Sequence, residues 1–175
     1  ETSSQIWTSP IYNSGAAKYT GTLSNQLLAE AGFSFNYEQY VITNQDGVNK
    51  TAFSPEWYAG ASRRDANLAT LYSGLANWGG RYPDRFALSG SLSYVTGSHN
   101  LKVGIQDNWG PYVNTREANA DLQQVYLSGV PNSVTIYNTP LRYKDSLVAD
   151  IGIYAQDTRT VDRLTLNAGI RWEHM

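Results

Sequence analysis

Histidine and carboxylate side chains could act as acids or bases in catalysis. In this chain their spacing argues against a catalytic site. His99 falls in a predicted turn and His174 lies beside the end of the sequence, and there is no cysteine. Two isolated imidazoles form neither a catalytic triad nor a zinc site. Glu30 and Glu38 share one side of a predicted strand, but about 26 Å of extended backbone separates them, too far for a catalytic carboxylate pair. We therefore expect no enzymatic activity, no metal site and no cofactor.

Aromatic and arginine side chains make ligand binding the better prediction. Those we single out as ligand-binding lie in one long connection: Trp57, Tyr58, Arg63, Arg64, Trp78, Arg81 and Tyr82. Exposed aromatic faces beside guanidinium groups suit sugars or anionic chelates. The alternative is that these side chains pack the connection together, or that Trp78 and Tyr82 belong to an aromatic girdle at a membrane surface.

The composition fits two classes of protein. Mean hydropathy is −0.43 and 41% of residues are hydrophobic, as in a soluble domain. An outer-membrane barrel is equally polar in bulk, because half of each strand faces water. The chain holds 13 Tyr and 5 Trp against 4 Phe, a balance that suits a bilayer interface. A net charge of −2 gives no support for nucleic-acid binding.

Alternation of apolar and polar residues predicts five long strands, near residues 25–40, 85–95, 101–109, 147–157 and 163–173. In a barrel the apolar row faces lipid, and it comprises Leu27, Phe33, Phe35, Leu88, Leu92, Val103, Ile105, Leu164, Leu166, Ile170 and Trp172. The polar row faces the lumen, and it comprises Glu30, Lys102, Gln106, Asn167, Arg171 and Glu173. In a soluble protein the same apolar row would lie in a core. Asp107 breaks the pattern, because it shares the parity of Ile105.

Connection lengths favour the barrel. The reversals Thr96–Asn100 and Thr158–Asp162 are short, whereas the connections 41–84 and 110–146 are long. Short turns at one end and long loops at the other are typical of outer-membrane barrels. We therefore predict an all-β fold, an antiparallel meander of long strands from a transmembrane β-barrel, forming one barrel segment over residues 1–175. The short turns are expected to be periplasmic and the long loops extracellular.

Three local features are also expected outside the five strands. The spacing of Leu68, Leu71, Tyr72 and Leu75 predicts a short helix over Ser62–Ala76. A hairpin is predicted around residues 129–132. The stretch Trp7–Ser24 is predicted to be the end of one strand and an irregular turn into the next.

Several segments resemble the TonB-dependent outer-membrane receptors. Residues 150–157, DIGIYAQD, and 163–173, RLTLNAGIRWE, are similar to the paired strands of that family. Residues 97–104, GSHNLKVG, the segment Trp7–Pro10 and residues 27–32, LLAEAG, strengthen the resemblance. Within that family, the sequence most resembles the subgroup that carries an N-terminal carboxypeptidase-regulatory-like domain.

The resemblance implies part of a barrel of about 22 strands with a plugged lumen in the bacterial outer membrane. It also implies import of a scarce nutrient, such as a metal chelate, cobalamin or a glycan, energised by the TonB complex. No plug domain is found, so we expect an internal stretch of barrel wall. Its partners would be membrane lipid and the remaining strands and plug of a longer chain, or other copies of itself. The alternative is a soluble or surface-assembled β protein, extracellular or on the cell surface, acting as an adhesin, a fibre subunit or a glycan-binding module.

Overall fold

The computed structural model describes residues 5–175 and divides them into two compact units. Unit 1 comprises residues 5–11, 38–82 and 113–144, and unit 2 comprises residues 12–37, 83–112 and 145–175. The strands β7 (Gly79–Thr96), β8 (His99–Arg116) and β11 (Leu141–Val161) contribute residues to both units. Each unit is described by itself.

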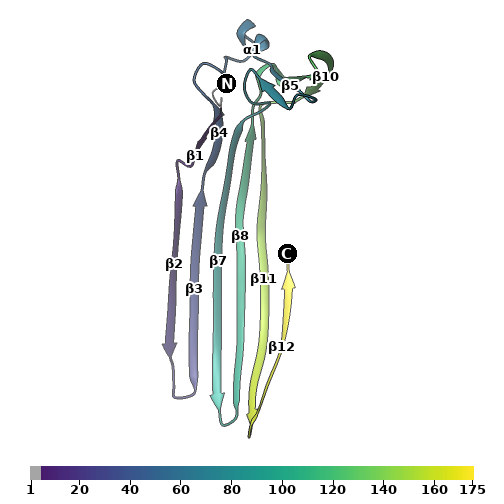
Figure 1. Ribbon diagram of the computed structural model, residues 1–175. Helices are drawn as coiled ribbons and strands as arrows, with labels where there is room; N and C mark the ends of the chain where they lie inside the picture. The colour runs from purple at the N-terminus through teal and green to yellow at the C-terminus, as the bar shows by residue number, and fades with distance from the viewer. Residues whose placement is uncertain (1–4) are drawn as a thin grey trace. The chain divides into compact units, whose positions relative to one another are not determined.

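Unit 2 is built from long antiparallel strands. β2 (Tyr12–Thr22), β3 (Leu27–Glu38) and β12 (Leu164–His174) join the three strands already named. Neighbours follow the order β2, β3, β7, β8, β11, β12 (Figure 1). The predicted all-β meander is confirmed, and within the described residues the sheet does not close into a barrel, because β2 and β12 each have one neighbour.

Strand register keeps apolar residues beside apolar ones. Across β3 and β7, Phe33 faces Leu88, Phe35 faces Phe86, Glu30 faces Ser91 and Gly32 faces Ser89. Across β11 and β12, Ile153 faces Trp172, Ala155 faces Ile170 and Tyr154 faces Arg171. Because successive side chains of a strand point to opposite faces, the sheet of unit 2 has one apolar face and one polar face.

Short turns close the three hairpins of unit 2. Residues 23–26 join β2 to β3, residues 97–98 join β7 to β8, and residues 162–163 join β11 to β12. In the first turn the Ser24 hydroxyl accepts hydrogen bonds from the backbone N–H groups of Gln26 (3.2 Å) and Leu27 (3.1 Å). Gly97 and Asp162 adopt left-handed backbone conformations (φ 50° and 54°) that suit tight reversals.

The strands are longer than the alternation predicted, and the residues 7–24 are more regular. That stretch was expected to be the end of one strand and an irregular turn, but it forms the last two residues of β1 (Gln5–Thr8) and all of β2. The strand expected over 25–40 ends at Glu38, and β4 (Tyr40–Asn44) follows it. β7, β8 and β11 all extend into the predicted loops 41–84 and 110–146. These added parts of the strands are held by hydrogen bonds to neighbouring strands. Their sequences lack the alternating apolar residues from which a strand could have been predicted.

Unit 1 holds a second, four-stranded sheet. Its order is β10 (Val130–Ile136), β9 (Leu122–Leu127), β5 (Ser62–Asp65) and β6 (Thr70–Tyr72). The hairpin predicted around residues 129–132 is confirmed as β9 and β10. The helix predicted over Ser62–Ala76 is wrong, because β5 pairs with β9 in parallel and with β6 in an antiparallel hairpin.

A small core in unit 1 lies under a one-turn helix, α1 (Pro55–Ala59). Ser54 caps it, and its hydroxyl accepts a hydrogen bond from the Trp57 N–H at 3.1 Å. Trp57 packs with Ala61, Ala120 and Leu122, next to the short 3₁₀ turn η1 (Asn119–Asp121). Neither helical segment, nor any other among the residues described, has the length and apolar character that a membrane-crossing helix requires.

Candidate functional site

The polar face of unit 2 gathers charged and amide side chains from five strands. We call this set the polar wall, and it consists of Lys18, Glu30, Lys102, Gln106, Tyr154, Arg171 and Glu173. Strand alternation accounts for its position, because each member lies between residues of the apolar face. Five of the six residues predicted to face a lumen therefore lie in one array.

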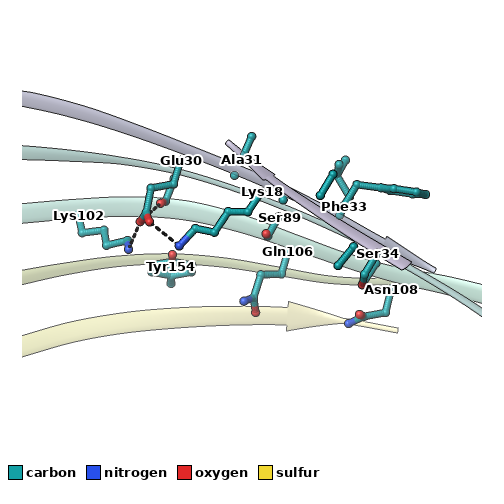
Figure 2. Close-up of a pocket in the computed structure, with 17 residues that line it drawn as sticks. Lys18, Glu30, Ala31, Phe33, Ser34, Ser89, Lys102, Gln106, Asn108 and Tyr154 are labelled. Carbon is teal, nitrogen blue, oxygen red and sulfur yellow. Dashed lines mark hydrogen bonds and ion pairs between the residues drawn. The ribbon is translucent and has the colours of Figure 1, made fainter. Parts of the chain in front are cut away.

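Glu30 is the centre of the first cluster of the polar wall. Its Oε1 lies 2.9 Å from Lys18 Nζ, and its Oε2 lies 2.9 Å from Lys102 Nζ (Figure 2). The Ser91 hydroxyl also donates to Glu30 Oε2 at 3.4 Å. Because β7 lies between β3 and β8, the Lys102 side chain reaches across a whole strand to make its ion pair.

Arg171 is the centre of the second cluster. Its Nη1 donates to Gln106 Oε1 at 3.0 Å, and its Nε donates to Glu173 Oε1 at 2.6 Å. This side chain also crosses a strand, β11, where Gly152 leaves room for it: a Cβ at Gly152 would lie 2.2 Å from Arg171 Nη2. Asn167, the sixth predicted residue, lies apart from both clusters, opposite Thr158 near the β11–β12 turn.

Small residues leave space in front of the polar wall. A hollow of about 470 Å³ is lined by Gly32, Ser34, Ser89 and the first cluster (Figure 2). Among residues 5–175 no three His, Cys, Asp or Glu side chains come together in a group that could hold a metal. The wall offers ion pairs, amides and hydroxyls, which suit contact with water or with a polar protein surface.

The apolar face holds every residue predicted to meet lipid. Leu92, Val103, Ile105, Ile170 and Trp172 line one shallow depression on it. The register places the others beside them: Leu27 opposite Tyr94, Phe33 opposite Leu88, Phe35 opposite Phe86, Leu164 opposite Val161 and Leu166 opposite Arg159.

Charged side chains stand near both ends of this apolar face, and Leu164 lies nearer the β11–β12 turn than Arg159 does. Toward the short turns stand Arg159 and the pair His99–Asp157, whose Nδ1 and Oδ2 lie 2.7 Å apart. At the other end stands Asp107, whose Oδ1 accepts a hydrogen bond from the Asp150 N–H at 3.1 Å. The exception seen in the sequence therefore lies at a boundary of the apolar band and has a backbone donor.

Aromatic rings line the same boundary as Asp107. The Phe86 ring meets Tyr37 edge-on at 5.5 Å and stacks on Trp109 at 5.7 Å. Along β7 the distance from Phe86 to Tyr94, at about 3.3 Å per residue, is about 26 Å. At the roughly 35–45° tilt of barrel strands, this length covers about 18–21 Å of depth, most of the lipid-facing band of an outer-membrane barrel, which is about 25 Å tall and is flanked by aromatic girdles.

The residues predicted to bind a ligand do not form one cluster in unit 1. Trp57 and Trp78 are only 7% and 8% exposed, so the expectation of exposed rings is wrong for both. Trp57 packs its ring against Tyr58, which is 56% exposed. Burial of these two indoles is the packing role that the sequence left open as an alternative.

The remaining predicted ligand residues lie on strands. Arg63 and Arg64 are neighbours on β5 and point to opposite sides of it. The Tyr82 ring covers Gly80 on β7. Trp78 and Arg81 line a common cavity with Arg116, which the sequence analysis missed because it falls in the predicted loop 110–146.

Asp65 was also missed, and it organises the turns of the second sheet. Its Oδ1 accepts hydrogen bonds from the N–H groups of Asn67 (3.1 Å), Leu68 (3.0 Å) and Ser128 (3.1 Å), and its Oδ2 from that of Gly129 (2.6 Å). Burial acts to raise the pKa of this carboxyl group, but the four backbone donors outweigh it, so the pKa lies below its ordinary value.

Comparison with known proteins gives one match. No curated protein and no solved structure matches the chain. The sequence matches the family described as outer membrane beta barrel domain over residues 3–175. This match agrees with the long antiparallel strands, the two-faced sheet and the aromatic boundary of its apolar band. The chain therefore belongs to the outer membrane beta barrel domain family and is a protein of the bacterial outer membrane.

Proposed function

We propose that this chain is part of the barrel wall of a TonB-dependent transporter that imports a scarce nutrient, such as a metal chelate, cobalamin or a glycan. In this proposal the apolar face of unit 2 meets lipid and the polar wall faces the lumen. The chain carries no catalytic activity of its own. Its partners are the membrane, further strands and a plug that fills the lumen.

The hollow in front of the polar wall is the observation that carries the proposal. In a small eight-stranded barrel, inward side chains fill the interior. Here Gly32, Ser34 and Ser89 contribute little volume to the polar face, so they are not the large inward side chains that fill a small barrel. A wall of this kind suits a wide lumen that holds water or a polar protein domain.

The resemblance seen in the sequence supports the transporter over a passive pore. Two residues of the segments that resemble this family have specific contacts. Arg171 belongs to the polar wall, and Asp157 pairs with His99 at the edge of the apolar band. The Lys102 and Arg171 clusters offer both charge signs and unused hydrogen-bonding capacity to a plug surface. A passive pore would have no need of such a partner.

Energy-dependent uptake tests the proposal. Cells lacking the gene should lose uptake of one solute from a panel of labelled metal chelates, cobalamin and oligosaccharides. Wild-type cells should lose the same uptake when the TonB complex is removed. Uptake that persists without the TonB complex and falls only with the size of the solute would contradict the proposal and identify a diffusion pore.

A further inference from the structure

A small cavity in unit 1 brings two arginines from different strands to one place. It has a volume of about 150 Å³, and Arg81 from β7 and Arg116 from β8 both line it. Asn77 and Asn114 add amide groups, and the buried Trp78 supplies an apolar side. The space is several times larger than the roughly 10–15 Å³ that one water molecule needs, so it has room for a single oxyanion group with part of its hydration shell.

The two guanidinium groups have no acidic partner. No ion pair joins either of them to a carboxylate within residues 5–175. No Asp or Glu lines the cavity. Glu117 follows Arg116 in the chain, but its backbone is committed to Trp78 and its carboxylate pairs with neither arginine. Two exposed arginines without a carboxylate partner therefore line a space that no acidic residue lines.

The backbone around the cavity is held firmly. The Trp78 N–H donates to the Glu117 carbonyl at 2.9 Å, and the Glu117 N–H donates back to Trp78 at 2.8 Å. The Gly80 N–H donates to Thr115 Oγ1 at 2.9 Å. These bonds fix the backbone at the ends of β7 and β8 beside the cavity, so the points from which the two exposed arginine side chains extend are held relative to each other.

From this geometry we propose that the cavity binds an oxyanion group, a carboxylate or a phosphate, of a small ligand. Arginine presents a planar fork of N–H donors that matches the two oxygens of a carboxylate or phosphate. Two such forks without an acidic competitor favour an anion over a neutral sugar. The inference rests on the proposed function, since it names the chemical class of nutrient that an importer built with this wall would recognise.

Equilibrium binding to the full chain, purified from outer membranes in detergent, tests the cavity. Isothermal titration with inorganic phosphate and, separately, with citrate should show saturable binding of at least one anion, and glucose should show none. Binding of phosphate alone or of citrate alone identifies which oxyanion the site takes. Because charged hydrogen bonds are lost, Arg81→Gln and Arg116→Gln should each weaken binding about tenfold.

Matched variants separate the cavity from general charge. Arg142→Gln removes an exposed arginine of the same unit that is not among the residues lining this cavity, and it should change affinity less than about twofold. Arg116→Lys keeps the charge but not the fork, so its affinity should fall between those of the wild type and Arg116→Gln, and it serves if the glutamine variant fails to fold.

Two results would overturn the inference: no saturable binding of either anion, or an effect of Arg142→Gln as large as that of the cavity variants. The measurement needs no transport. Anion binding without energised uptake would leave the cavity standing and defeat the transporter, whereas uptake without anion binding would defeat the cavity alone.

Discussion

At the scale of single residues, adjacent side chains of one strand occupy opposite environments. Leu88 belongs to the apolar face and is 50% exposed in the protein alone, so its surroundings in the cell must come from outside unit 2. Ser89 points to the other face and lines the hollow of the polar wall. The two positions share one backbone segment and differ only in the medium they meet.

That contrast gives a prediction for a charge placed on each face. Leu88→Arg should reduce the free energy of unfolding from lipid bilayers by about 1–2 kcal/mol, because it carries a guanidinium into the lipid band about a quarter of the way from Phe86 to Tyr94. Ser89→Arg should cost under about 0.5 kcal/mol, because the new side chain enters open polar space. Urea titration of both variants in bilayers measures the difference. Equal losses would mean that the faces are wrongly assigned.

Asp65 gives a prediction about acid. The pKa of its carboxyl group in the folded protein lies below the unfolded value of about 3.9. Its contribution to stability is therefore complete above that value and is lost as the pH falls through the lower, folded pKa. The amides of Ser128 and Gly129 should exchange hydrogen faster as the pH is lowered in this range, after correction for intrinsic rates.

The Asp65→Asn variant is the control, because it does not titrate. Its exchange at Ser128 and Gly129 should be fast at every pH, since an amide side chain cannot accept all four bonds of the carboxylate. Acid sensitivity that survives in this variant would place the titrating group elsewhere.

At the scale of elements, the hairpins of unit 2 predict the topology in the membrane. Gly97 lies in the short β7–β8 turn and Gly47 in the long connection after β4, and a Cβ at either would meet nothing within 4 Å. Both sites therefore offer room for an inserted epitope. A tag at Gly47 should bind antibody on intact cells, whereas a tag at Gly97 should bind only after permeabilisation. The reverse pattern would invert the orientation.

The sequence predicted most of the strands that have a different medium on each side, together with the β9–β10 hairpin. It missed β2 and the strands of unit 1 that are defined only by their pairing. β3, β12 and the centres of β7, β8 and β11 alternate because apolar and polar surroundings select their side chains in turn. β5 carries the sequence Ser62-Arg-Arg-Asp65, which has no such alternation, and it is a strand because β9 and β6 flank it. Sequence alone could also not reveal that Arg116 joins Arg81, since pairing across strands creates that cavity.

At the scale of the whole molecule, the backbone groups along the outer edges of β2 and β12 need hydrogen-bond partners. Each strand has one neighbour among residues 5–175, so a row of backbone N–H and C=O groups on its outer side lacks a ladder partner there. In the hydrocarbon core of a membrane every such group must be paired. We therefore expect both edges to be covered by further strands in the outer membrane, as the proposed transporter requires.

The strand-crossing reach of Lys102 and Arg171 has a consequence for how the wall is put together. Lys102 ties the second hairpin to Glu30 of the first, and Arg171 ties the third to Gln106 of the second. If a hairpin docked one residue out of step, its cation would be turned toward the acyl chains. If it docked two residues out of step, the cation would be displaced by about 6.6 Å and would lose its partner. The contacts of these two side chains therefore favour the native register of each hairpin over registers shifted by one or two residues.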